Sequence, residues 1–448
     1  MRTTIEHYFP TLFDQLRALD DVRHTGKASD YELAAHLTAC LALFLFKLDS
    51  RNHWNQKRKK WQFQRNYKKL FGFAMPHGDS MHAVIRLLDE QQVEQLKQQL
   101  VRGLLARKVF RHQRYQNRWY CIAIDGSGVV SFDHKHCDQC LHKTSKHGKT
   151  TYSHQILDAR LVTPNGFSVS VATEWVENPA GGDYDKQDCE RKAFQRLAER
   201  LKASFPRLPI LILADGLYPY EGFFTTCRAC GWEWCTTFKE GNLPALWEEV
   251  HALQRLQTGQ TLSTTRYEPG VVKPATVAQH YRWITDLDYH GHTLHWISCE
   301  EITTRRKRSP DKKTVTDDMT LARFVHITSL PVTARLIADL SQTARLRWKV
   351  ENEGFNTLKN GGYGMEHKWA RKCYRAMKNY YQFMQIAHLI HQLMLKWQRF
   401  VKRYLQGPNH PTVKSLWEDL LGAMQWGKVK RKPLRRWLKK PLQFRLVT

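Results

Sequence analysis

Three carboxylates stand where they could hold divalent cations. Asp125 and Asp215 each end a short apolar run typical of a buried strand, and Glu351 follows much later, four residues after Arg347, in a segment with helical character. Carboxylate oxygens are the ligands that Mg²⁺ prefers, and two such ions can activate an attacking oxygen and stabilise a leaving one in phosphoryl transfer. The three acids therefore predict a catalytic site with two Mg²⁺ (or Mn²⁺) ions.

Each acid also has a purely structural interpretation. Asp125 and Asp215 both precede glycine, a pair that is common in turns. Arg347, Glu351 and Phe355 would share one helical face, where an arginine and a glutamate four residues apart often form a surface ion pair. A common site requires that the first and fourth strands be parallel neighbours, so that the aspartates emerge side by side and a crossing helix brings Glu351 opposite them.

A second group of side chains could bind a softer metal. Cys137 and Cys140 are spaced as Cys-x2-Cys, and thiolates with imidazoles are the ligands that suit Zn²⁺. The alternative is a polar loop that lies on DNA. Five histidines are near enough in sequence to complete a zinc site: His134, His136, His142, His147 and His154. The other such pair, Cys227 and Cys230, falls in a short predicted helix, where small core residues are the better interpretation.

The charge of the chain predicts a polyanionic partner. Seventy Lys and Arg residues face 42 Asp and Glu residues, which gives a formal net charge of +28. A folded, aromatic-rich protein with this excess most often binds nucleic acid; the alternative is a generic basic or ribosome-associated protein. No apolar run is long enough to span a bilayer, and the N-terminus lacks a signal segment, so we expect a cytoplasmic protein without a membrane partner.

Two basic segments are the predicted DNA contacts. Residues 51–69 carry eight bases and no acid, interleaved with four aromatic side chains, and residues 371–448 carry 18 Lys and Arg against two acids. Lys and Arg side chains pair with the phosphates of DNA, and aromatic side chains can pack against the protein or stack on bases. The alternatives are a solvated helix with its aromatics turned inward and a disordered tail. The bases singled out are Lys57, Arg58, Lys59, Lys60, Lys430, Arg431 and Lys432.

The periodicity of the chain predicts an α/β protein with several regions. Strands are expected at residues 120–130, 154–162, 167–176, 209–214 and 232–238, with helices at 186–201 and 220–230. This order, β-β-β-α-β-α-β, matches an RNase H-like core. The predicted regions are a helical, DNA-binding 1–115; the first part of the core, 116–238; a β-rich insertion, 239–321; the second part of the core with the glutamate helix, 322–404; and a basic C-terminal tail, 405–448.

Inside the last three regions the pattern is less regular. A hairpin is expected from strands at 281–289 and 293–302, followed by a polar, basic loop at 303–318. The chain then runs helically until glycines stop it after Asn360, and a further long helix covers 374–404.

Taken together, the spaced motifs resemble the DDE-type insertion-sequence transposases that carry a β-rich insertion before the glutamate. The segments that carry the resemblance are 123–127, 136–140, 152–154, 186–190, 214–218 and 347–360. The family's helix signature, Tyr-x2-Arg-x3-Glu-x6-Lys, places its arginine at Arg347 and its glutamate at Glu351. Ala344 stands in place of the tyrosine, and the lysine, Lys359, comes one position late.

The resemblance implies a function and its participants. Asp125, Asp215 and Glu351 would be the metal-binding triad of an RNase H-like catalytic core, and Arg345, Arg347 and Lys359 would contact phosphates. The enzyme would hydrolyse DNA at the ends of its own element and transfer the freed 3′-OH strand into target DNA. It would act as a homodimer in a synaptic complex, associated with a prokaryotic nucleoid. The alternatives are an RNase H-like structure-specific endonuclease and a non-catalytic DNA-binding descendant.

Overall fold

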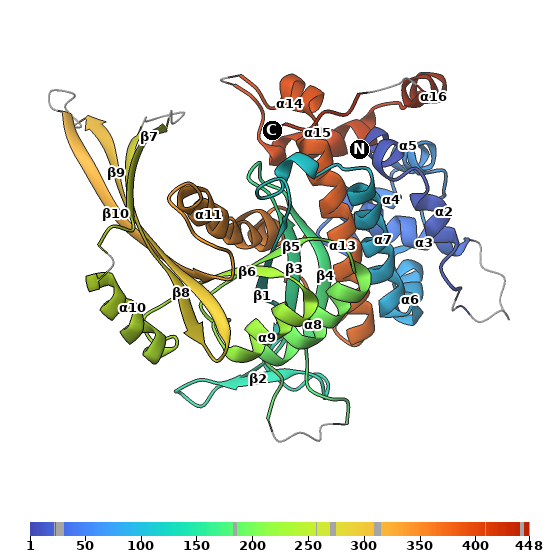
Figure 1. The fold of residues 1–448 in the computed structure, drawn as a ribbon. Coiled ribbons are helices and arrows are strands. Elements are labelled where there is room, and N and C mark those ends of the chain that lie inside the picture. The colour runs from blue at the N-terminus through green and yellow to red at the C-terminus, as the bar shows by residue number, and fades with distance from the viewer. Residues whose placement is uncertain are drawn as a thin grey trace.

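The computed structural model describes residues 1–21, 23, 31–181, 186–256, 258–268, 275–308, 315–407, 409–439 and 443–447. It is a mixed α/β protein with a helical N-terminal region, a ten-stranded mixed sheet that includes a β-rich segment, and a helical C-terminal region (Figure 1). The predicted α/β class, with helical terminal regions and a β-rich segment, is thereby confirmed. Within the described ranges, no helix is long and apolar enough to cross a membrane.

Five strands form the part of the sheet that positions the acids. β3 lies between β4 and β1, and β1, β5 and β6 follow as parallel neighbours. The requirement that the first and fourth expected strands be parallel neighbours is met by the pairing of β1 with β5. Every residue of β4 and β5 is buried, as expected for strands covered on both faces. Their bounds are β1 (Tyr120–Phe132), β3 (Thr150–Val162), β4 (Ser168–Val176), β5 (Ile210–Ala214) and β6 (Glu233–Thr237).

The β-rich segment continues the same sheet. β10 pairs with β6 over three residues at its end and with β9 along its whole length. The predicted boundary between the insertion and the second part of the core, after residue 321, therefore lies inside a single strand. In Figure 1 these long strands form a curved arm beside the core. The bounds are β7 (Thr261–Glu268), β8 (Ala275–Tyr289), β9 (His292–Arg308) and β10 (Val315–Thr328). They are preceded by helix α10 (Pro244–Leu256), which was not predicted.

The predicted polar loop at 303–318 is wrong. Residues up to 308 belong to β9 and residues from 315 belong to β10, and the six residues between them lie outside the described part. The ladder places Arg305 opposite Asp318 and Arg306 opposite Asp317. Opposite charges across an antiparallel pair stabilise the ladder, which explains why a polar segment forms strands here.

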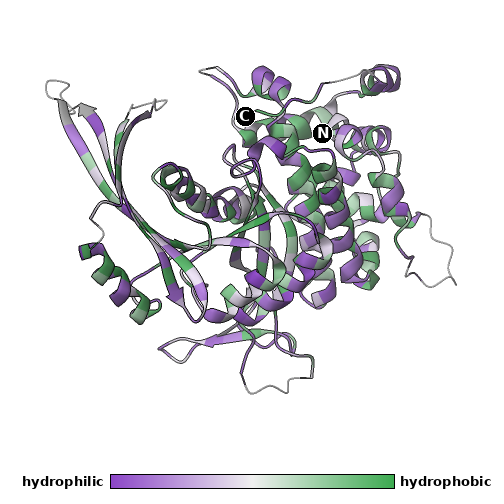
Figure 2. Ribbon diagram, in the orientation of Figure 1, coloured by the Kyte–Doolittle hydropathy of each residue, from purple (hydrophilic) through white to green (hydrophobic). Residues whose placement is uncertain are grey.

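Helices from both ends of the chain pack together beside the sheet. α3, which is apolar except for His36 and Thr38, is buried over its whole length and contacts α13. α13 also contacts α6, α7 and β4. Figure 2 shows green, hydrophobic residues along the strands of the core, whereas α16 is mostly purple. The helices concerned are α1 (Arg2–Tyr8), α2 (Leu12–Arg17), α3 (Leu33–Leu45), α4 (Arg51–Arg58), α5 (Trp61–Phe71), α6 (Gly78–Leu87), α7 (Glu90–Ala106) and α13 (Tyr374–Leu395).

The C-terminal region is folded rather than tail-like over its described residues. The helix predicted at 374–404 is two helices, because the chain is extended at Trp397, which bridges to Leu446. Two further helices follow where a disordered tail was the alternative. The bounds are α14 (Gln398–Tyr404), α15 (Val413–Trp426) and α16 (Arg431–Lys439).

Two predicted helices lie between strands of the core. Their bounds are α8 (Glu190–Ser204) and α9 (Glu221–Cys230).

Candidate functional site

The parallel pairing of β1 and β5 brings Asp125 and Asp215 to one edge of the sheet. Asp125 lies two residues beyond Ala123, which is in register with Leu213, and Asp215 follows the last residue of β5. Each carboxylate accepts a backbone hydrogen bond nearby: Asp125 from Gly126 at 3.0 Å and Asp215 from Leu217 at 2.9 Å. These bonds fix both side chains where the pairing of β1 with β5 ends.

Glu351 comes to this edge on a helical segment of mixed geometry. The chain passes from α11 (Ile337–Ala344) through a 3-10 turn at Arg345–Arg347 and a π-helix at Val350–Asn356 into α12 (Thr357–Asn360). The helix and its stop were predicted, but the α-helical register was not kept. Glu351 is exposed whereas Phe355 is fully buried, so they do not share a face. Short π-helical turns occur frequently at functional sites.

The charges of the three acids act on one another. Burial, together with the negative charges of Asp215 and Glu351, raises the pKa of the Asp125 carboxyl from 3.8 to about 6. The Arg347 guanidinium opposes this, because its Nη1 lies 3.2 Å from Asp125 Oδ2. The structure therefore brings the three predicted acids within electrostatic range and adds the predicted arginine to the same site.

A fourth carboxylate, Glu190, belongs to this site and had no predicted role. It is the first residue of α8, where a negative charge is favourable beside the helix N-terminus. A side chain on Gly126 would overlap the Glu190 carboxylate, so the two approach closely. Burial, then the charges of Asp125 and Asp215, raise the pKa of Glu190 to about 7. Glu190 ends segment 186–190, one of the segments that carry the family resemblance, and this was the only sequence signal that could have pointed to its role.

The other predicted residues of the glutamate helix point elsewhere. Arg345 forms an ion pair of 2.8 Å with Glu301 and lies over the ring of Phe324, which ties the helix to the β-rich arm. Lys359 lies 3.1 Å from Glu366. Among the residues described, Arg347 is the one of the three predicted phosphate contacts that touches an acid of the site.

The two predicted basic segments lie side by side. Asn66 of α5 bonds to the backbone of Met424, Gly427 and Val429, and α5 contacts α15. Three of the four aromatic rings in 51–69 are buried, in agreement with the alternative of inward-facing aromatics, while Trp61 is 65% exposed.

Not all the bases of these segments are available to a partner. Lys57 donates to Gln425 at 3.1 Å and Arg58 to the carbonyl of Met75 at 3.0 Å. Five of the predicted bases are exposed and form what we call the composite basic surface: Lys59, Lys60, Lys430, Arg431 and Lys432.

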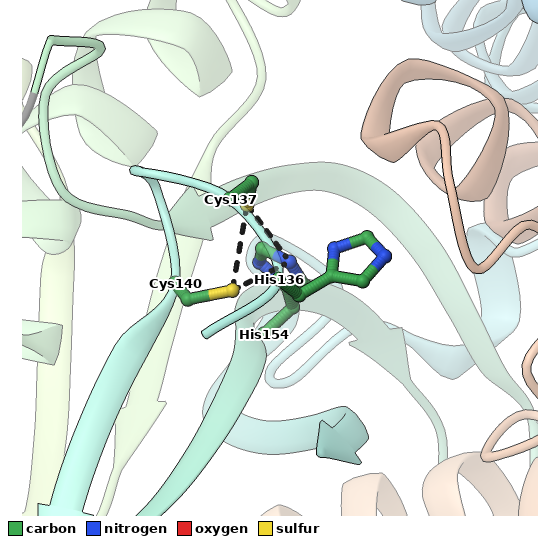
Figure 3. Close-up of side chains that lie close together, drawn as sticks. All are labelled: His136, Cys137, Cys140 and His154. Atoms are coloured by element: carbon green, nitrogen blue, oxygen red, sulfur yellow. Dashed lines mark hydrogen bonds between the residues drawn. The ribbon is translucent and has the colours of Figure 1, made fainter. Parts of the chain in front are cut away.

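The Cys/His group forms a compact cluster (Figure 3). The ligand atoms of His136, Cys137, Cys140 and His154 all lie within 4.8 Å of one another, so the cluster could hold a zinc ion. The structure selects two of the five candidate histidines; the other three are exposed. No second group of three or more such side chains meets this distance limit among the described residues, and the four carboxylates do not.

No protein-family model matches the sequence, and no curated protein matches it.

Proposed function

We propose that the protein is a DDE-type transposase, a Mg²⁺-dependent enzyme that cuts DNA at the ends of an insertion element and joins the freed 3′ strand to target DNA. One observation carries the proposal: two aspartates from parallel neighbouring strands and a glutamate from a distant helix lie within electrostatic range of one another. The strand order β4-β3-β1-β5-β6, antiparallel then parallel, supports an RNase H-like core.

The donor set fits a hard cation. Asp125, Asp215 and Glu351 offer carboxylate oxygens only, and like charges at close range favour a divalent ion between them. Two Mg²⁺ ions bound by these side chains would activate the attacking oxygen and stabilise the leaving one. The oxygens of these acids do not all lie within 4.8 Å of one another, so the side chains must move closer together to share an ion. We expect Asp125 to release Arg347 in that movement, when a cation binds.

The protein's own groups account for the other requirements of the reaction. Arg347, once free of Asp125, can pair with a phosphate oxygen of the strand to be cut. Glu190, with a pKa of about 7, can take up or release a proton at neutral pH. In the first step the oxygen of water loses a proton and bonds to phosphorus, and the bond from phosphorus to the 3′ oxygen breaks, which leaves a 5′-phosphate and a 3′-OH. In the second step that 3′ oxygen loses its proton and bonds to the phosphorus of a target phosphodiester, whose bond to its own 3′ oxygen breaks and leaves a target 3′-OH.

The distribution of charge supports a DNA substrate. The composite basic surface offers five exposed bases from two distant parts of the chain, and the formal net charge of the whole is +28. Two element ends must meet for strand transfer, so the working form would be a homodimer on double-stranded DNA.

A second candidate is a DNA-binding protein without catalysis. The ion pair between Arg347 and Asp125, together with the absence of a tight ligand group among the described carboxylates, favours it. An RNase H-like endonuclease that cuts without strand transfer is a third; a β-rich arm and a composite basic surface are more than such a nuclease requires.

A cleavage assay distinguishes these functions. The substrate is duplex DNA that carries the sequences flanking the coding region, with and without Mg²⁺ or Mn²⁺. A transposase cuts and joins strands only with the metal, an endonuclease cuts without joining, and a binder does neither. Asp125→Asn, Asp215→Asn and Glu351→Gln are each expected to bind this DNA and leave it uncut. Glu353→Gln is the matched control, because Glu353 pairs with Lys349 at 2.9 Å.

A further inference from the structure

We infer that His136, Cys137, Cys140 and His154 bind one structural Zn²⁺ ion, which fixes the base of an exposed basic hairpin. The hairpin consists of β2 (Leu141–Thr144) and the start of β3. Three of the ligands come from the loop between β1 and β2, and the fourth, His154, lies in β3. The ion would therefore join the loop between β1 and β2 to strand β3, which pairs with β1.

The distances within the cluster match a tetrahedral metal site. For zinc bonds of about 2.3 Å to sulfur and about 2.0 Å to nitrogen, two sulfurs should lie about 3.8 Å apart, and a sulfur and a nitrogen about 3.5 Å apart. The observed separations are 3.4 Å between the sulfurs, 3.5 Å from Cys137 Sγ to His154 Nε2, and 3.4 Å from Cys140 Sγ to the same nitrogen. Both cysteines are free thiols, and their separation is far too long for a disulfide bond.

The two histidine rings are held in place before any metal binds. The ring of His136 stacks on Phe132 with centroids 4.4 Å apart, and the ring of His154 stacks on Tyr374 at 3.9 Å. His136 Nδ1 is buried and has no hydrogen-bond partner among the residues described. A buried imidazole nitrogen without a partner is costly in a protein interior, and a metal bond would satisfy it.

The surroundings of the cluster show what the ion would stabilise. The loop that supplies three ligands contains no regular secondary structure and is tied to the core by Asn178, which bonds to the carbonyls of Cys140 and Gln139 at 2.8 and 3.2 Å. β2 is four residues long, lies at the edge of the sheet and pairs with β3 alone. Short two-stranded ribbons are marginally stable, so a metal anchor at the base has a clear role.

The anchored hairpin has a distinctive charge. Residues 141–153 contain three lysines, two histidines and no acid, and its tip is exposed. Such a ribbon suits the phosphate backbone of a nucleic acid. This use would depend on the proposed DNA substrate, whereas zinc binding depends only on the four ligands.

The test uses the full chain purified under reducing conditions without added metal. Elemental analysis is expected to give one zinc per chain. Cys137→Ser and His154→Ala should lose the zinc, whereas Cys230→Ser, from the other Cys-x2-Cys pair, should retain it. Replacement by Co²⁺ should give the intense visible absorption of a tetrahedral thiolate site in the wild type and in Cys230→Ser, and should not give it in Cys137→Ser.

Two results would overturn the inference. One is wild-type protein that contains no zinc and gives no cobalt spectrum; the other is Cys137→Ser that retains a full equivalent of zinc. X-ray absorption at the zinc edge of the wild type provides a measurement that does not depend on whether the variants fold, and it should show two sulfur and two nitrogen ligands. Metal-dependent DNA cleavage by protein without zinc would leave the acidic site intact, so the two proposals fail separately.

Discussion

Replacing Asp125 by asparagine is expected to stabilise the protein at alkaline pH and to leave its stability unchanged in acid. The reason is that the folded protein disfavours the ionised form of this carboxyl. Burial and the neighbouring acids raise its pKa from the ordinary value of 3.8 to about 6. Asparagine has nearly the same shape, carries no charge, and retains an oxygen that can accept from Arg347.

The magnitude follows from the change in pKa. A rise of about two units, at about 1.36 kcal/mol per unit, corresponds to roughly 3 kcal/mol. At a pH below 3.8 both the folded and the unfolded chains carry the proton and the difference is absent. As the pH rises towards 6, the unfolded chain loses the proton first, so the free energy of unfolding falls by this amount and stays lower above about pH 7.

Urea denaturation at about pH 3 and about pH 8, without divalent ions, measures this difference. The variant should be equal to the wild type at the lower pH and more stable by about 3 kcal/mol at the higher pH. Mg²⁺ added at the higher pH should stabilise the wild type more than the variant, because the ion binds the ionised carboxylate. Asp419→Asn, on the exposed surface of α15, is the control and should change stability by less than about 0.5 kcal/mol.

Two results would refute this reasoning. If Asp125→Asn is less stable than the wild type at about pH 8, Asp125 is a structural partner of Arg347 and not a strained member of an acid cluster. If the difference between the two proteins is the same at both pH values, the carboxyl titrates alike in the folded and unfolded chains.

Three further predictions concern the support of the site and its partner. Arg160→Met should lower the free energy of unfolding by about 3–5 kcal/mol in urea denaturation, because it leaves the charge of Asp158, 2.6 Å away and fully buried, without its partner. Gly354→Ala should lower metal-dependent cleavage, because its Cβ would lie 3.0 Å from Arg160 Nε, beneath the π-helix of Glu351; Gly103→Ala, with open space around it, should leave cleavage unchanged. Replacing the three bases at 430–432 by alanine should weaken binding to all duplex sequences and reduce the slope of log affinity against log salt by up to about three, as a fluorescence titration would show.

The strands of the core were predictable because their signals are local. Residues 210–214 are wholly apolar, and such a run predicts a strand buried on both faces. The parallel neighbours β1 and β5 then followed from the order of elements. The prediction of a loop at 303–318 was wrong for the opposite reason. Its arginines and aspartates stabilise each other only when β9 and β10 pair, and that pairing joins positions that are distant in the sequence.

The candidate site was predictable in its acids and not in its details. Glu190 was missed because an acid at the start of a helix has two interpretations that look alike in the sequence. It can simply stabilise the N-terminus of its own helix, or it can also face other acids, as Glu190 faces Asp125 and Asp215. The histidine ligands could not be chosen from sequence, since His136 and His154 are 18 residues apart and meet only through the pairing of β1 with β3. The π-helical turn at Glu351 likewise depends on packing, because Gly354 lies against the buried Arg160 and Ser168.

Binding of Mn²⁺ in the presence of duplex DNA, followed by electron paramagnetic resonance, measures directly whether the three acids form a cation site. The wild type and Glu353→Gln should bind the ion with equal affinity, and Asp125→Asn, Asp215→Asn and Glu351→Gln should each weaken binding at least about tenfold, the loss of about 1.4 kcal/mol. Equal binding by all five proteins would contradict the convergence of Asp125, Asp215 and Glu351 on a common ion.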